Sequence, residues 1–248
     1  MRGKESVLDI RAELRVKDTV VTLPIECKKN NPDFTNWIFF EKEEKKVPRP
    51  VNSSQIINDE RPAPKSGWNV QLRLVPFLTN YCITNNARET KGNYIELSQK
   101  NKSNITKTAN TSINDAAFQI ALATQAVFHE EHIHSKTLSN STAKPPYKIQ
   151  LLLPVVITTA KLLLCNFNAE DINSKTGEIS YDKVKLSEQP YLVYEYPLPR
   201  LLQKIPANLI DALNTQSLEV FVRMDILIIN SSHFTEFLTK IAKDLISS

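Results

Sequence analysis

The sequence predicts a mixed α/β (α+β) fold in which helices flank a mixed central β-sheet. Two segments near its start, residues 7–16 and 19–27, alternate apolar and polar side chains, as a strand with one buried face does. Two later segments, residues 113–132 and 234–245, repeat apolar residues every three or four positions, as an amphipathic helix does. An apolar stretch at residues 149–164 adds buried strand structure.

Composition indicates a folded protein. The chain has 248 residues, of which 41% are hydrophobic, so it can bury a substantial core as one domain. Its formal charge of +4 is compatible with a nucleic-acid partner but is small for this length. Cys27, Cys82 and Cys165 have no metal-binding spacing, which favours reduced thiols and a cytoplasmic location. We expect no membrane partner, because the longest apolar stretch is too short to span a bilayer.

The first two segments predict a β-hairpin with Lys17 and Asp18 as its turn. Antiparallel pairing then places each residue i opposite residue 35 − i, so that the apolar side chains share one face. These side chains are Leu8, Ile10, Ala12 and Leu14 on the first strand and Val21, Leu23, Ile25 and Cys27 on the second.

The same register predicts two carboxylates side by side on the other face of the hairpin. Asp9 lies opposite Glu26, with Cβ atoms about 4.5–5.5 Å apart, and Lys28 points the same way. Two carboxylates this close repel each other unless a cation separates them. Mg²⁺ suits such a site, and Mn²⁺ is an alternative. If a phosphodiester bound to this metal, Lys28 would orient or deprotonate the water that attacks it.

A simpler interpretation of the same residues remains open. The hairpin face would then be an exposed surface of mixed charge, on which Asp9 forms an ion pair with Lys28 or Arg11.

The rest of the chain predicts further elements in order. Residues 32–44 show near-helical spacing and predict a short helix, and the proline-rich residues 47–64 predict an irregular loop. Residues 70–84 predict a pair of strands. Residues 85–112 are rich in Asn, Lys, Thr and Ser and predict a mobile insertion, which either contacts phosphates or is a tolerated surface loop.

Residues 113–132 predict a helix that carries Gln119, and residues 149–164 predict a strand after it. Residues 191–196 and 218–230 then predict strands, and Ser231 or Ser232 caps a last helix. We therefore expect one domain, residues 1–248, with a core at 5–165 and an extension of the sheet plus a closing helix at 166–248.

Two short motifs resemble the core of the PD-(D/E)XK nuclease superfamily, which is restriction-endonuclease-like. They are Leu8-Asp9-Ile10 and Ile25-Glu26-Cys27-Lys28. The amino-acid sequence of the second motif is typical of the Mrr-like branch of this superfamily. In that branch the second motif is followed by a helix that carries a glutamine and then by a further strand. In this chain the helix expected at residues 113–132, with Gln119, and the strand expected at residues 149–164 match this order. The resemblance implies that Asp9, Glu26 and the backbone carbonyl of Cys27 bind Mg²⁺, that Lys28 is catalytic, and that Gln119 supports the site.

One departure from this family concerns the start of the core. Members usually have a helix and a strand before the aspartate strand, but only eight residues precede Asp9 in this sequence. We therefore expect the N-terminal part of the core to be missing, and a second copy or a partner chain to complete the sheet.

The resemblance implies a Mg²⁺-dependent DNA endonuclease that hydrolyses phosphodiester bonds, or a remnant of one. One alternative is a non-catalytic nucleic-acid-binding or assembly subunit that keeps the fold. A second alternative is a structural or partner-binding protein in which the match of Asp9, Glu26 and Lys28 to the motif is accidental.

Overall fold

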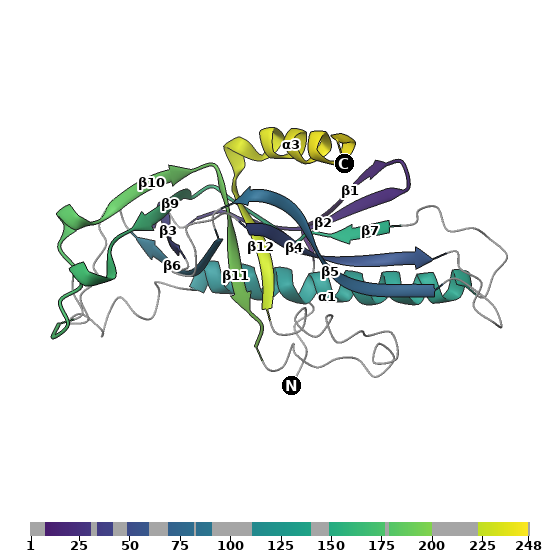
Figure 1. Ribbon diagram of the computed structural model, residues 1–248, viewed down its shortest axis with the longest axis horizontal. Coiled ribbons are helices and arrows are strands. Elements are labelled where there is room, and N and C mark those ends of the chain that lie inside the picture. The colour runs from purple at the N-terminus through teal and green to yellow at the C-terminus, as the bar shows by residue number, and fades with distance from the viewer. Residues whose placement is uncertain are drawn as a thin grey trace.

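The computed structural model describes residues 8–30, 34–41, 49–59, 69–81, 83–90, 111–139, 149–176, 179–199 and 223–247 (Figure 1). These residues form one mixed β-sheet and two α-helices, which confirms the mixed α/β class.

The 12-stranded sheet has the order β10-β9-β3-β6-β11-β12-β8-β2-β7-β4-β5, and β1 pairs with β2 outside this path. The strands are β1 (Ile10–Val16), β2 (Thr19–Lys28), β3 (Asn36–Glu41), β4 (Arg49–Asp59), β5 (Asn69–Tyr81), β6 (Ile83–Thr90), β7 (Ile149–Leu152), β8 (Val155–Thr158), β9 (Lys161–Asn166), β10 (Lys185–Gln189), β11 (Tyr191–Pro197) and β12 (Arg223–Asn230). The helices are α1 (Thr111–Ser139) and α3 (Phe234–Ser247), with short 3₁₀ turns η2 (Ala169–Asp171), η3 (Tyr181–Lys183) and η5 (Ser231–His233).

Strand β2 holds a central position. It pairs with β1 in antiparallel fashion on one edge, and with β7 and then β8 in parallel on the other. The register along β2 continues unchanged from β7 to β8, so these two strands form one line that Pro154 interrupts. Beyond this line β4 pairs with β7 and β12 pairs with β8. The sheet therefore divides into two arms at Pro154.

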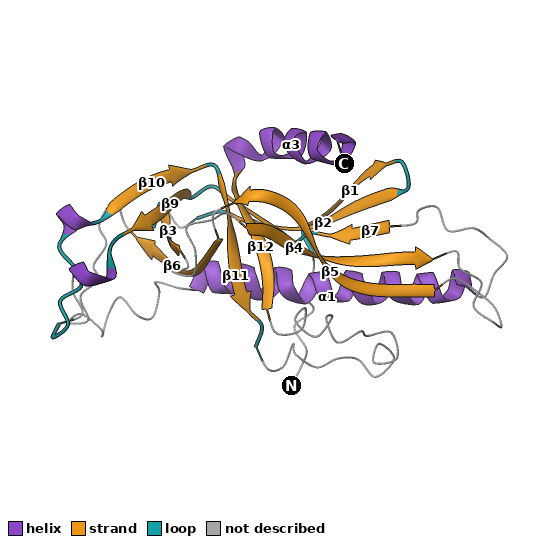
Figure 2. Ribbon diagram, in the orientation of Figure 1, coloured by secondary structure: helices purple, strands orange, loops and turns teal. Residues whose placement is uncertain are grey.

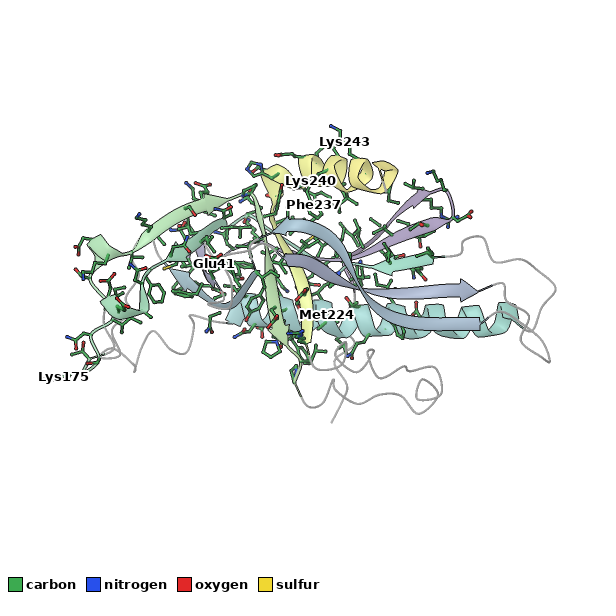
Figure 3. All side chains as sticks on the ribbon, viewed as in Figure 1. Glu41, Lys175, Met224, Phe237, Lys240 and Lys243 are labelled. Carbon is green, nitrogen blue, oxygen red and sulfur yellow. The ribbon has the colours of Figure 1, made fainter. Side chains whose placement is uncertain are left out.

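The two helices cover opposite faces of the sheet (Figure 2). On one face, here called the α1 face, α1 packs on Val156, Ile226 and Ile228. On the other, the α3 face, α3 packs on Val155, Leu227 and Ile229. Successive residues of β8 and β12 thus alternate between two cores. Phe237 lies on the sheet side of α3 and is fully buried, whereas Lys243 lies on the opposite side (Figure 3).

The predicted hairpin register is confirmed from Ile10, which faces Ile25, to Val16, which faces Thr19 across a turn at Lys17 and Asp18. The predicted pair of Asp9 and Glu26 is not part of this register, because β1 begins only at Ile10. Lys17 has the left-handed φ of 51° that such a short turn requires. The predicted apolar face is only partly correct. Ala12, Leu14 and the inward residues of β2 pack on the α3 face, but β1 begins at Ile10, which is 47% exposed, and Leu8 packs on the α1 face instead.

The helix predicted at residues 32–44 is wrong, because residues 36–41 form β3. Trp37 and Phe39 point to the α1 face, and Ile38 points to the opposite face against Leu163 and Cys165. A strand buried on both faces is a continuous apolar run, which periodicity cannot distinguish from a short buried helix.

The loop predicted at residues 47–64 is also wrong in part, because residues 49–59 form β4. Its proline, Pro50, is the second residue of the strand, near an irregular stretch of the pairing with β5, where a missing amide proton is tolerated. The strands predicted at 70–84 exist, but β5 pairs with β4 and β6 pairs with β3 and β11. The insertion predicted at 85–112 is wrong at both ends, because residues 85–90 belong to β6 and residues 111–112 to α1. Residues 91–110 lie outside the described part.

The predicted helix at 113–132 is confirmed and extends over 111–139. The strand predicted at 149–164 is divided into β7, β8 and β9. The later strands and the closing helix are also present, and β11 and β12 lie within the sheet between β6 and β8. The division into a core at 5–165 and an extension at 166–248 stays a prediction. Neither helix of the described residues combines the length and apolar character needed to cross a bilayer.

The start of α1 is anchored by Glu89 of β6. The Glu89 side chain, on a residue only 5% exposed, accepts hydrogen bonds from the Ile113 amide (3.0 Å) and the Ser112 hydroxyl (3.2 Å). The first turn of α1 has no acidic residue of its own. Glu89 therefore supplies the negative charge that a helix N-terminus favours, and it fixes α1 against the sheet.

We expect Glu89→Ala to lower the free energy of unfolding by about 1–2 kcal/mol, because it leaves the first amides of α1 without an acceptor. Glu89→Gln should lose less, since it keeps one oxygen acceptor. Equilibrium urea unfolding measures both variants. A Glu89→Ala variant as stable as the unmodified protein would show that the contact does not anchor α1.

Candidate functional site

The centre of the site is the side chain of Glu26, which β2 places on the α1 face. Glu26 is only 6% exposed, so its carboxylate has little solvation by water. Lys28 lies two residues further along the strand and therefore on the same face. Its Nζ atom is 2.7 Å from Oε1 of Glu26. The ammonium group thus compensates the buried carboxylate.

Helix α1 contributes Gln119, which is distant in sequence but contacts Lys28 directly. The Lys28 Nζ donates a hydrogen bond to Oε1 of Gln119 at 2.5 Å. The contact is possible because α1 packs on the same face of the sheet that carries Glu26 and Lys28. Lys28 is therefore held between a carboxylate of the sheet and an amide oxygen of the helix.

Asp9 lies at the edge of β2, one residue before β1 begins. Its Oδ2 accepts a hydrogen bond from the backbone amide of Cys27 at 2.8 Å. The amide and carbonyl of one strand residue project to the same side of the strand. The Cys27 carbonyl therefore projects toward the edge at which Asp9 lies, whereas the Lys28 carbonyl projects the other way and accepts from the Thr159 amide.

The thiol of Cys27 is a poor ligand or nucleophile. Partial burial raises its pKa above the usual value, and the negative charges of Asp9 and Glu26 raise the pKa further. The side chain is therefore protonated at neutral pH, which disfavours metal binding through sulfur. The backbone carbonyl is the group of this residue that suits a hard cation.

The carboxyl ends of three parallel strands meet beside Lys28. The pairing aligns Lys28 of β2 with Thr158 of β8 and Asn230 of β12. Just beyond this row, the Asn30 amide donates to Oγ1 of Thr159 at 3.1 Å. The Asn230 side chain donates to the carbonyl of Ala160 at 2.8 Å. These bonds tie the strand ends together and restrict the backbone that carries Lys28.

The donor set suits Mg²⁺. Asp9 and Glu26 offer carboxylate oxygens and Cys27 offers a carbonyl oxygen, which are the hard ligands that this ion prefers. Among the residues that the structure describes, no group of three or more His, Cys, Asp or Glu side chains forms a metal cluster. Two carboxylates suffice for Mg²⁺, because it commonly keeps several waters and takes oxygens from a phosphate.

The structure thus joins Glu26, Lys28 and Gln119 by direct contacts, and it places Asp9 on the backbone amide of Cys27, the residue between Glu26 and Lys28. The mixed-charge interpretation fits less well, because Glu26 is buried and Asp9 bonds a backbone amide. The contact between Asn30 and Thr159 was not predicted from the sequence.

Comparisons with protein-family models, with curated proteins and with solved structures found no match to this chain.

The pairing of Glu26 with Lys28 predicts coupled stability. We expect Lys28→Met to lower the free energy of unfolding by about 2 kcal/mol, less than for a fully buried pair because the Lys28 side chain is 23% exposed. The double variant Glu26→Gln/Lys28→Met should lose less than the two single losses combined. Urea unfolding of all four proteins measures this coupling.

The pair of Glu13 and Arg15 serves as a control for that cycle. Its atoms are 3.2 Å apart, but its side chains are 33% and 62% exposed, so its coupling should be close to zero. Equal coupling in the two cycles would contradict the special role of the Glu26 pair.

Proposed function

We propose that this protein is a Mg²⁺-dependent DNA endonuclease of the PD-(D/E)XK type. The observation that carries the proposal is the convergence of Glu26, Lys28 and Gln119 on one face of β2, with Asp9 bound at its edge. Four residues chosen from a motif and a resemblance come from three separate segments of the chain. The contacts of Lys28 with Glu26 and Gln119, and of Asp9 with the Cys27 amide, support a site rather than a chance match.

Each residue has a role that follows from its surroundings. Asp9 and Glu26 provide the oxygen ligands, and the hydrogen bond from the Cys27 amide fixes the orientation of the Asp9 carboxylate. Lys28 positions or deprotonates the attacking water, and Gln119 restricts the rotamer of Lys28. When bound, Mg²⁺ supplies charge stabilisation for the phosphodiester under attack.

The spatial neighbours of β2 are consistent with a restriction-endonuclease-like core. Helix α1 packs on the face of β2, and β7 and β8 pair with β2 in parallel. Along the chain the four strands β3 to β6 separate β2 from α1, which departs from the order that the resemblance implies. The hairpin strand β1 pairs on the other edge. Strand β2 thus lies between β1, which follows Asp9, and the strands that follow α1, which supports the proposal.

A second candidate is a non-catalytic nucleic-acid-binding or assembly subunit of the same fold. The outer edge of β1 favours it, because within the described ranges β1 pairs only with β2. A strand from a second copy or a partner chain would extend the sheet by pairing there. For either function we propose a cytoplasmic location, in keeping with the free thiols of Cys27 and Cys165.

We expect the purified protein to nick supercoiled plasmid DNA in Mg²⁺ but not in EDTA. Glu26→Gln and Lys28→Ala should each reduce the rate at least about 100-fold, because they remove a ligand oxygen and the cation beside the reacting phosphate. Glu13→Gln is the matched control and should nick at the normal rate, because its exposed carboxylate lies further along β1. DNA binding without any nicking would favour the non-catalytic subunit.

Mg²⁺ should also stabilise the folded protein, since the site exists only in the folded state. At about 100 times Kd the gain is about 2.7 kcal/mol, which corresponds to roughly 5–10 °C in Tm for a chain of this size. Differential scanning fluorimetry should show the shift for the unmodified protein and for Glu13→Gln, and a much smaller one for Asp9→Asn. An equal shift in Asp9→Asn would place the ion elsewhere.

A further inference from the structure

Arg11 is the basic residue of β1 next to the candidate site. It lies two residues after Asp9 and faces Pro24 across the hairpin, which makes Glu26 its diagonal neighbour. Its neighbours Ala12 and Leu14 alternate with it and pack on the α3 face. Arg11 therefore projects to the α1 face, the same face as Glu26.

Arg11 also connects the hairpin to α1. Its Nη1 is 3.8 Å from Oε2 of Glu130, and its Nη2 is 3.3 Å from Oε1 of Glu13. Gln119 and Glu130 are 11 residues apart on α1, which brings them to within about 20° of the same side of the helix.

Two side-chain contacts between the sheet and α1 thus lie on either side of the Glu26 and Asp9 carboxylates. Gln119 contacts Lys28 at one end, and Glu130 contacts Arg11 at the other. The two contacts on α1 are about 16 Å apart along the helix axis. Along β2, Glu26 lies between Pro24, which faces Arg11, and Lys28, which contacts Gln119. Asp9 lies at the exposed edge of β2. A substrate that reaches the carboxylates over the β1 edge therefore passes Arg11.

We propose that Arg11 binds a backbone phosphate of the DNA substrate beside the phosphodiester that is cleaved. This inference rests on the proposed function and names a further substrate-binding residue of the same site. Glu26 and Asp9 repel an approaching phosphate, and Lys28 is already paired with Glu26. The guanidinium of Arg11 supplies the attractive charge on the accessible side.

The contacts of Arg11 with Glu13 and Glu130 can be exchanged for a phosphate. The Arg11 side chain is 32% exposed and that of Glu130 is 72% exposed, and such surface ion pairs contribute little. A phosphate offers the guanidinium two parallel, charge-assisted hydrogen bonds, which are stronger than either contact.

Arg15 provides a matched control for the test. It lies on the same face of β1 and contacts the same Glu13, at 3.2 Å, but it is four residues further from the site and 62% exposed. We would measure binding of a short DNA duplex by fluorescence anisotropy over a range of salt concentrations. Ca²⁺ replaces Mg²⁺ as an oxygen-bound divalent ion.

We expect Arg11→Ala to bind the duplex about tenfold more weakly, and the slope of log K against log salt to fall by about one. Arg11→Lys should be intermediate, because it keeps the charge but not the planar fork. Arg15→Ala should bind within about twofold of the unmodified protein. Far-UV circular dichroism and urea unfolding establish that each variant is folded.

Equal binding by folded Arg11→Ala and Arg15→Ala would overturn the role of Arg11. Plasmid nicking by the unmodified protein would still support the nuclease function in that case. If the unmodified protein neither binds nor nicks DNA, both the proposed function and this inference are wrong.

Discussion

The structure around the candidate site depends on the burial of one carboxylate. Glu26 is 6% exposed, and a charged group removed from water is costly unless a cation and hydrogen bonds compensate it. Lys28 provides the cation, Gln119 fixes Lys28, and β2 holds Glu26 between β1 and β8. The hairpin, the centre of the sheet and α1 therefore each position a group around the same carboxylate. The charges of Asp9 and Glu26 both raise the pKa of the Cys27 thiol, so two negative groups act on this end of β2.

The hairpin was predictable because its determinants are local. A two-residue turn fixes the register, and alternation then decides which side chains share a face. The interior strands were harder to predict, because their environment comes from distant segments. Strand β3 is apolar on both faces since β6 and β9 flank it within the sheet, and β4 owes its extended form to pairing with β5 and β7. Such partners leave no periodic signal in the segments themselves.

The candidate site shows the same division. The turn predicted that Asp9 lies beside the end of β2, but its side chain bonds the Cys27 amide rather than pairing with Glu26, because β1 starts one residue later. The contact of Gln119 with Lys28 spans 91 residues and depends on how α1 crosses β2, which no spacing specifies. The same applies to Arg11 with Glu130 and to Asn30 with Thr159. The contact of Glu89 with the start of α1 is a further example. The first turn of α1 has no acidic residue, and the acceptor for the Ile113 amide comes from strand β6 instead.

The position of β12 has a consequence for how the chain folds. It follows all the other strands along the chain, yet it lies in the interior of the sheet, between β11 and β8. The sheet cannot close around the row of Lys28, Thr158 and Asn230 until this segment has been synthesised and has inserted. Pairings between segments so distant in sequence are slow to form. Before then β8 presents an apolar strand edge without its partner, so the nascent chain passes through a stage that is prone to aggregation.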